Sequence, residues 1–252
     1  MITDPWFYAV AIPAVLLMGL SKSGFGGGFG ALAVPLMALA VPVPQAAAIM
    51  LPLLAIMDGF GLAALWRECD RALIRLLLPA GLAGTVVGTL LFGWLSPPVV
   101  AGLVGVLTLG FLAIRRFFPP RADAPPPSRR LGWLLGMTSG FTSFVAHAGS
   151  PPIGFYVLPL KLSPVVFTAT MAVFFAAINL SKWIPYAWLG LIDVPNMLAS
   201  VVLMPLAPLG VWIGVRLVRR VPVGLYYGLF ELGMLLTGLK LVWDAVRSVG
   251  GG

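Results

Sequence analysis

Two segments of small and polar residues interrupt apolar stretches of the sequence, and both contain groups that can bind an anion. The first spans residues 21–30 and holds the candidate ligands Lys22, Gly26, Gly27 and Gly28. Glycine lets a ligand approach the backbone closely, and unpaired N–H groups at a helix start attract negative charge. A lysine at membrane depth costs ~2.5–3.5 kcal/mol and therefore usually serves function. The alternatives are that the glycines only pack helices and that Lys22 reaches the cytoplasm.

The second segment spans residues 138–152 and is rich in hydroxyl groups. Ser150 can cap a helix that starts at Pro151. The only histidine, His147, lies in this segment and is a candidate anion ligand or proton carrier. A histidine held by structural hydrogen bonds is the alternative. We predict contacts to a substrate from Ser143, His147, Gly149 and Ser150.

Four further polar residues lie within apolar stretches. Asn179 and Lys182 are three residues apart, so they share one face of a helix. We predict that both bind the substrate, with a lysine that snorkels to water near the helix end as the alternative. Asp58 and Glu231, together with His147, are the candidates for proton coupling. Ion pairing with a lysine is the alternative for the two acids.

The composition places these residues in a membrane. Of 252 residues, 60% are apolar, and 16 Lys/Arg and 8 Asp/Glu give a net charge of +8. Soluble domains use roughly a quarter charged residues, and disordered chains are poor in apolar ones, so both classes are excluded. We expect an all-α integral membrane protein, in which excess basic residues mark cytoplasmic loops and not nucleic-acid binding. The single cysteine excludes a disulfide framework, and we expect no metal and no cofactor.

Turn residues and charges divide the sequence into ten apolar runs. They are residues 6–20, 28–42, 45–66, 73–94, 98–117, 131–145, 151–162, 165–188, 195–215 and 223–244. Six of them have about 20 residues, enough to cross ~30 Å of hydrocarbon. The shorter runs form two pairs, each flanking one polar segment as a broken helix. A connector at 119–130, rich in proline and arginine, separates a first membrane repeat (1–118) from a second (131–252).

We predict that the halves are inverted repeats of five helical segments each. Matching positions are Pro79, Gly84 and Gly88 with Pro205, Gly210 and Gly214, and Ser23-Gly24-Phe25 with Ser139-Gly140-Phe141. Basic residues concentrate at 67–75, 115–130 and 216–220, so the connector should be cytoplasmic and both termini should be periplasmic. Secondary transporters often have this design, with substrate at the midplane where the breaks meet. Aromatic residues near segment ends, among them Trp183 and Tyr186, should form interfacial belts.

At these motifs the sequence resembles the TauE/SafE family of sulfite and organosulfonate exporters. The resemblance rests on the Gly-Phe-Gly-Gly-Gly-Phe-Gly run at 24–30, the short segment at 35–44 that ends in proline, and the repetition of this arrangement in the second half. It implies a bacterial inner-membrane exporter of small sulfur oxyanions such as sulfite and sulfoacetate. The second half departs from a glycine run, because Ala146-His147-Ala148-Gly149-Ser150 stands in its place. Substrate selection can therefore differ from that of other members.

We predict a secondary transporter that exports a small oxyanion by alternating access, with proton coupling as a weaker hypothesis. An anion channel is the main alternative. An integral membrane enzyme is disfavoured, since the chain has one histidine, one cysteine and no metal-binding or paired-acid motif. A structural membrane partner would not need two opposed glycine breaks beside lysines. The sequence leaves homo-oligomer formation open.

Overall fold

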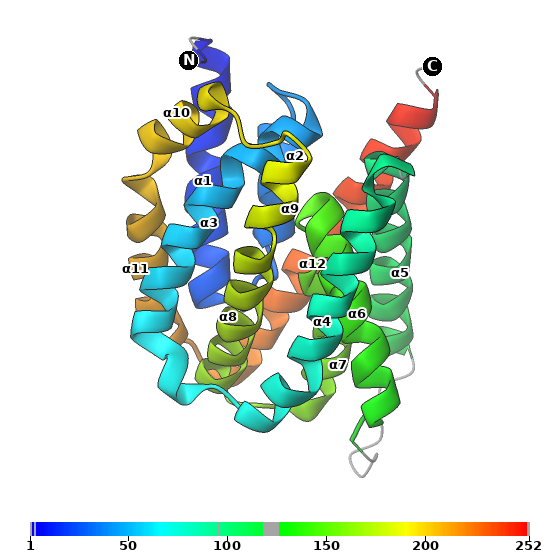
Figure 1. The fold of residues 1–252 in the computed structure, drawn as a ribbon. Helices are drawn as coiled ribbons and strands as arrows, with labels where there is room; N and C mark the ends of the chain where they lie inside the picture. Colours follow the sequence, from blue (N-terminus) through cyan, green and yellow to red (C-terminus); the bar gives the residue numbers. More distant parts are fainter. Residues whose placement is uncertain (1, 3, 95, 118–125, 251–252) are drawn as a thin grey trace.

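The computed structural model describes residues 2, 4–94, 96–117 and 126–250, and every regular element in this part is helical (Figure 1). The all-α prediction is therefore confirmed. The α-helices, in chain order, are α1 (Pro5–Gly24), α2 (Ala33–Met37), α3 (Val43–Leu65), α4 (Arg71–Leu91), α5 (Pro97–Phe117), α6 (Arg129–Ala146), α7 (Ser150–Val157), α8 (Pro164–Ser181), α9 (Trp183–Trp188), α10 (Val194–Leu203), α11 (Leu206–Val218) and α12 (Val223–Gly250).

Several helices have the length and apolar composition that a membrane span requires. Within the described residues, the spans Pro5–Gly24, Gln45–Glu68, Arg71–Leu91 and Pro164–Trp188 meet this requirement. Helices α10 and α11 meet it together and are bent by 48° at a short break. A span needs about 20 residues at 1.5 Å rise each, so these elements can cross ~30 Å of hydrocarbon.

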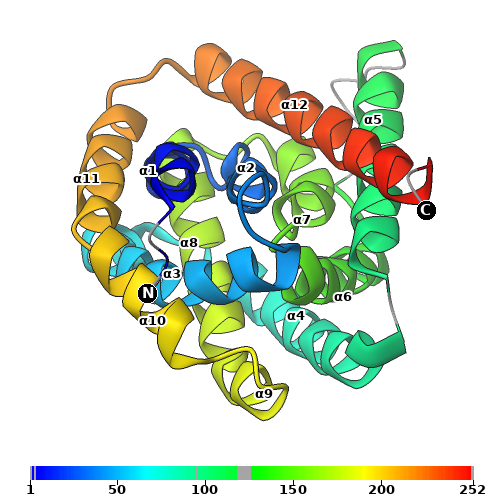
Figure 2. The same cartoon turned by 90° about the horizontal axis from the view of Figure 1, so that it is seen from above.

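The two broken segments form hairpins that open toward opposite ends of the bundle. Helix α1 descends from the end that holds the N-terminus, and α2 returns toward that end (Figure 1). Helix α6 rises from the opposite end, and α7 returns there (Figure 1). Seen from above, α2 and α7 lie near the centre, within the outer helices (Figure 2). The turns of both hairpins therefore lie inside the molecule.

Helices of the two halves pack on each other reciprocally. The first helix, α1, packs along α11 of the second half, while α6 packs along α4 of the first half. Helices α3 and α8 contact each other, as do α5 and α12. Each half thus supplies the helix that completes the packing of the other.

Glycines allow the closest of these contacts. A Cβ atom added at Gly140 would lie 1.8 Å from the carbonyl oxygen of Gly81, and one at Gly84 would lie 1.9 Å from that of Met137. Helix association in lipid relies on van der Waals packing, which small residues improve by letting backbones approach. The α4–α6 contact therefore requires glycine at both positions.

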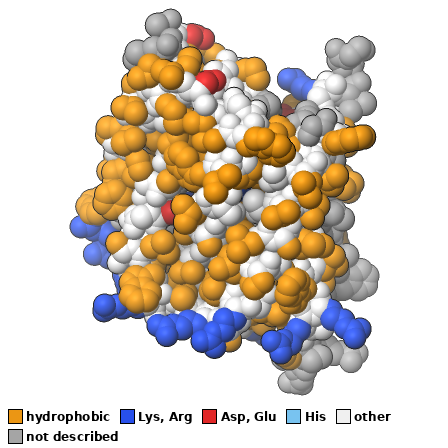
Figure 3. Space-filling model, viewed as in Figure 1, with side chains coloured by type: hydrophobic (Ala, Val, Ile, Leu, Met, Phe, Trp, Pro, Cys, Tyr) orange, Lys and Arg blue, Asp and Glu red, His pale blue; other side chains and the backbone are white. Residues whose placement is uncertain are grey.

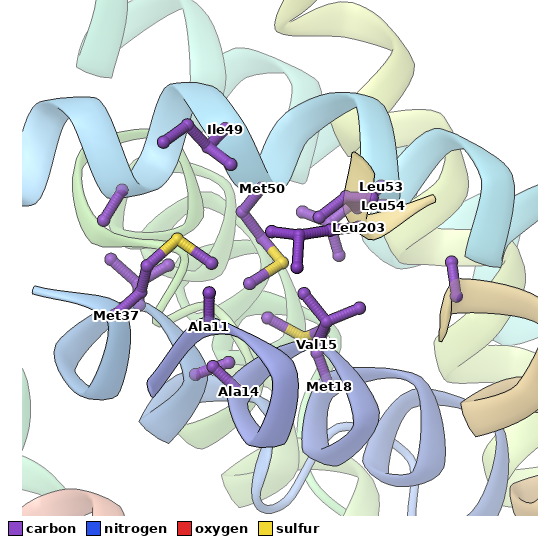
Figure 4. Packing of buried hydrophobic residues seen from close by; sticks show 14 of the residues in the cluster. Ala11, Ala14, Val15, Met18, Met37, Ile49, Met50, Leu53, Leu54 and Leu203 are labelled. Atoms are coloured by element: carbon purple, nitrogen blue, oxygen red, sulfur yellow. The ribbon is translucent and has the colours of Figure 1, made fainter. Parts of the chain in front are cut away.

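A compact apolar cluster holds α1, α2 and α3 together. Figure 4 shows Val15 and Met18 of α1 facing Met50 and Leu54 of α3, with Met37 of α2 beside them. These side chains are at most 5% exposed. The cluster fixes the hairpin α1–α2 against α3, which places the first polar break next to the middle of α3.

Basic side chains gather at the end of the bundle opposite the N- and C-termini (Figures 1 and 3). The loop between α3 and α4, the start of α6 and the end of α11 lie at this end (Figure 1). Arg219 at the end of α11 pairs with Glu68 of the α3–α4 loop at 2.8 Å. The basic clusters expected on one side of a membrane are therefore brought to one end of the molecule.

Two details of the predicted segments need correction. Helix α7 begins at Ser150, with Gly149 at the capping position and no side-chain cap, so Ser150 does not cap a helix starting at Pro151. Helix α6 already begins at Arg129, where the hydroxyl of Ser128 accepts a hydrogen bond from Leu131 N–H. The connector at 119–130 therefore ends earlier than expected, and most of its residues lie outside those described.

Candidate anion site

Each hairpin turns at one residue in the left-handed conformation, followed by the same type of hydrogen bond. Helix α1 is followed by Gly26 at φ +54°, and the N–H of Gly27 donates to the Ser21 carbonyl at 2.9 Å. Helix α6 is followed by His147 at φ +51°, and the N–H of Ala148 donates to the Thr142 carbonyl at 3.2 Å. Such left-handed helix ends normally use glycine, because a side chain is strained there. His147 therefore occupies the position that Gly26 occupies in the first half.

This correspondence of the two turns differs from the alignment of the halves that the sequence predicts. Ser23-Gly24-Phe25 lies directly before its turn, whereas Ser139-Gly140-Phe141 lies inside α6, more than one helical turn earlier. These tripeptides are thus at different places in their hairpins. The offset from Gly26 to His147, 121 positions, also relates Asp58 of α3 to Asn179 of α8.

An ion pair inside the molecule joins α1 to α3. The ammonium of Lys22 contacts Oδ1 of Asp58, and each side chain is only 8% exposed. The second carboxylate oxygen, Oδ2, accepts a hydrogen bond from the Asn179 amide at 2.9 Å. A buried charge pair is tolerable when its remaining lone pairs are also satisfied, and Asn179 meets this condition. The alternative considered for Asp58, pairing with a lysine, is therefore found, and the ammonium of Lys22 is held inside the molecule.

The second lysine, Lys182, is fully buried and has a different environment. Its Nζ donates to the carbonyl oxygen and the hydroxyl of Ser143, both at 2.8 Å, and to Oδ1 of Asn179 at 3.0 Å. Within the described residues, no carboxylate lies at ion-pair distance from Lys182. Snorkelling of Lys182 to water is therefore wrong.

The His147 ring extends this polar network. Its Nδ1 lies 3.3 Å from Nζ of Lys182. Because Nδ1 faces an ammonium, it is the acceptor, and Nε2 carries the proton of a neutral ring. Tyr186 lies 3.5 Å from Nε2 and donates its hydroxyl proton to the Phe144 carbonyl at 2.9 Å.

A small cavity lies against this network. It offers about 30 Å³ to the centres of water-sized molecules, and a water needs roughly 10–15 Å³ on this measure. Its lining residues are Met18, Lys22, Gly27, Gly30, Leu54, Ser143, His147, Ser150, Phe175 and Asn179. The cavity is thus bounded by polar groups of both hairpins and by apolar walls, and it has room for a small ion.

The structure brings together most of the predicted ligands. Lys22, Gly27, Ser143, His147, Ser150 and Asn179 line the cavity. Lys182 lies directly behind Ser143, His147 and Asn179. Asp58 joins the same network through Lys22 and Asn179. Glu231 lies on α12, outside the set of cavity-lining residues.

Two of the backbone N–H groups predicted to hold the anion, those of Gly27 and Gly28, are used within the first turn. The N–H of Gly27 donates to the Ser21 carbonyl and that of Gly28 to the Phe25 carbonyl at 3.0 Å. These donors are occupied by the turn itself, so an anion cannot use them in this conformation. Gly28 packs against Phe230, Gly26 against Phe167, and Gly149 against Phe175. These three glycines allow close packing around the cavity and do not line it.

Sequence reasoning missed several residues of the site. Tyr186 was assigned to an interfacial belt, but it is 1% exposed and contacts His147. Tyr186 follows Lys182 by four residues, a spacing that places both on one helical face and could have indicated a place near the site. Met18, Leu54 and Phe175 line the cavity but carry no signal beyond that of ordinary core residues.

Comparison with known proteins gives one match. A family model described as Sulfite exporter TauE/SafE matches residues 11–241 of the chain. No curated protein and no solved structure matches. The matched range includes both hairpins and every residue of the cavity and its network.

Proposed function

We propose a transport mechanism for this chain on the premise that it belongs to the sulfite exporter TauE/SafE family, whose model matches nearly its whole length. The family implies a multi-pass membrane exporter of sulfite or a related anion. The proposed substrate is a small sulfur oxyanion, and the proposed site is the cavity between the hairpins. The observation that carries this proposal is the pair of buried lysines, Lys22 and Lys182, of which only Lys22 contacts a carboxylate, that of Asp58.

The groups around the cavity suit the binding of an anion. Lys22, the Ser143 hydroxyl and the Asn179 amide supply donors at the cavity wall, and Ser150 contributes a further hydroxyl. Lys182 supplies positive charge from behind the wall through Ser143 and Asn179. In a water-poor site such interactions are stronger than in solution. Substrate oxygens would therefore replace water at these donors.

The hairpins offer a route to alternating access. They open to opposite ends of the bundle (Figure 1), and the halves pack reciprocally. We propose that residues 1–118 and 131–252 are inverted repeats and that rocking of one against the other opens the cavity to each side in turn. Transporters with inverted repeats and broken helices work in this manner.

We propose that the basic end faces the cytoplasm of a bacterial cell and that both termini face the periplasm. Cytoplasmic loops carry an excess of Lys and Arg, and Figure 3 supports this orientation for the inner membrane. Proton coupling remains a weaker part of the proposal. His147 and Asp58 are its candidates because they belong to the polar network, whereas Glu231 lies outside the cavity lining.

The proposal is tested by sulfite flux into proteoliposomes that contain the purified protein. Wild-type protein should accumulate sulfite against its gradient when an ion gradient is imposed, and Lys182→Met should reduce this flux at least about tenfold. Lys240→Met is the matched control, because Lys240 pairs with Asp244 on α12, away from the cavity. Flux that only follows the sulfite gradient would favour a channel. Full flux in Lys182→Met would reject the site.

A further inference from the structure

The charges around the cavity indicate the valence of the anion that it accepts. Resting on the proposed transport function, we propose that the site selects a monovalent oxyanion, such as hydrogen sulfite, over divalent ones. The divalent class includes the sulfite dianion, sulfate and sulfoacetate. The proposal rests on the contacts of Lys22, Asp58 and Lys182 and on the small volume of the cavity.

The first ammonium is already neutralised. Lys22 contacts Asp58 directly, and both side chains are buried. The other oxygen of this carboxylate accepts from Asn179. The amide of Asn179 therefore stands between Asp58 and Lys182, whose ammonium donates to Oδ1 of the same amide. The carboxylate of Asp58 is thereby committed to Lys22 and Asn179.

The second ammonium has only neutral partners. Three oxygen acceptors lie within 3.0 Å of Lys182 Nζ, two from Ser143 and one from Asn179. We take Lys182 to be the ammonium, whose three N–H groups match these three oxygen acceptors. His147 is a further titratable side chain in contact with Lys182, with Nδ1 at the longer distance of 3.3 Å, and its neutral ring adds no charge. Tyr186, beyond it, is a neutral hydroxyl.

The described groups that line the cavity or contact its lining residues, on α1, α3, α6, α8 and α9 and at Lys182, therefore sum to one positive charge. An uncompensated charge at membrane depth is expensive. One monovalent anion brings the loaded site to neutrality. A divalent anion would leave one negative charge in the same low-dielectric position. The free-energy cost of removing the dianion from water would therefore not be offset by its attraction to the site.

The size of the cavity points in the same direction. Room for about two water molecules accommodates an ion built on one central atom. Phe175, Met18 and Leu54 close the cavity on its apolar side. A dianion with an additional carbon chain, such as sulfoacetate, would need these side chains to move and would place a second charge against them.

Binding to purified protein, measured by isothermal titration calorimetry, tests the proposal. The probes are nitrate and methanesulfonate as permanent monoanions, sulfate as a dianion, and sulfite at pH 6 and pH 8.5. We expect at least one of the monoanions to bind about tenfold or more tightly than sulfate. Sulfite affinity should fall as alkaline pH converts hydrogen sulfite to the dianion, while nitrate affinity should change less. Sulfate binding as tight as that of both monoanions would overturn the proposal.

Charge-changing variants test the cause of the preference. Asp58→Asn raises the wall charge to +2, so the ratio of sulfate to monoanion affinity should rise about tenfold. The double variant Lys22→Met/Asp58→Asn restores +1, so the wild-type ratio should return even at lower affinity. An unchanged ratio in Asp58→Asn would refute selection by charge. If Asp58→Asn does not fold, the double variant still tests selection by charge, because a preference of the double variant for sulfate would refute it. Absence of binding by every anion, including sulfite, would reject the proposed function as well, whereas sulfate binding alone would reject only this inference.

Discussion

The amide of Asn179 donates to the carboxylate of Asp58 at 2.9 Å, and this contact links the two halves of the chain beside the cavity. The same amide accepts from Lys182 through its oxygen. Asn179 thus orients one carboxylate and one ammonium at once while keeping them apart. The arrangement makes the amide, which has both a donor and an acceptor, the group that separates the two charged centres.

Asn179→Asp should therefore abolish transport while leaving a folded protein. A carboxylate at this position would neutralise Lys182 and place a second negative charge beside Asp58, so the wall would lose its net positive charge. We expect sulfite flux to fall at least about tenfold. Asn196→Asp, the same change in α10 outside the cavity lining, is the control. Wild-type flux in Asn179→Asp would show that the wall charge does not govern binding.

Removal of Lys22 alone should cost both stability and transport. The buried carboxylate of Asp58 would lose its cationic partner, and breaking such a pair typically costs about 3–5 kcal/mol. Lys22→Met should therefore lower the thermal midpoint, measured by the loss of monodisperse protein on heating. The double variant Lys22→Met/Asp58→Asn should recover most of that stability but not the flux. Equal stability of the single and double variants would contradict the buried pair.

Substitutions at His147 distinguish the effect of backbone strain on stability from the effect of the ring on transport. Its φ of +51° lies in the left-handed region, which costs a side-chain residue about 1–2 kcal/mol that glycine does not pay. His147→Gly should thus be at least as thermostable as wild type, whereas His147→Val should be less stable. If the ring serves the site, His147→Gly should still lose flux. Normal flux in this variant would assign His147 a structural role only.

More of the fold than of the site could be predicted from the sequence. Alternating apolar runs and breaks sufficed to predict the helices, since a span needs only length and hydropathy. For Asp58 the sequence leaves proton coupling and pairing with a lysine as alternatives, because it does not show that α3 passes beside the first break. The sequence also does not show that the tight turn itself uses the N–H groups of Gly27 and Gly28. Tyr186 does not join an interfacial belt because its side chain points inward from α9 while Ile184 and Trp188 stay exposed, which a local pattern does not reveal.

Close contact between α4 and α6 predicts a steric effect of one methyl group. Gly140→Ala would place a Cβ against the carbonyl of Gly81, and overpacking of this kind costs about 1–3 kcal/mol or more. We expect a lower thermal midpoint and lower yield. Gly228→Ala on α12 meets no neighbouring atom within 4 Å and is the matched control. Equal midpoints for both variants would show that the two helices can separate without loss.

Asp58 also faces the outside of the bundle through a groove between α3 and α8. The groove is far larger than the anion cavity, with about 440 Å³ on the same measure. Its lining residues are Ala55, Asp58, Gly59, Leu62, Val173, Ala176, Ala177, Leu180 and Trp183. Apart from Asp58 the lining is apolar, so a membrane-soluble reagent can approach this carboxyl group from lipid.

A membrane-soluble carbodiimide such as dicyclohexylcarbodiimide should therefore modify Asp58. The acid O–H adds across one C=N bond, with the carboxyl oxygen joining carbon and the proton joining nitrogen; acyl migration then gives a stable N-acylurea. Because the reaction needs the protonated acid, labelling measured by mass spectrometry should rise as pH falls. It should rise further in Lys22→Met, since a buried acid without a cationic partner is most stable when neutral. Label on Asp244 or Glu231 but not on Asp58 would show that the groove is closed in the membrane.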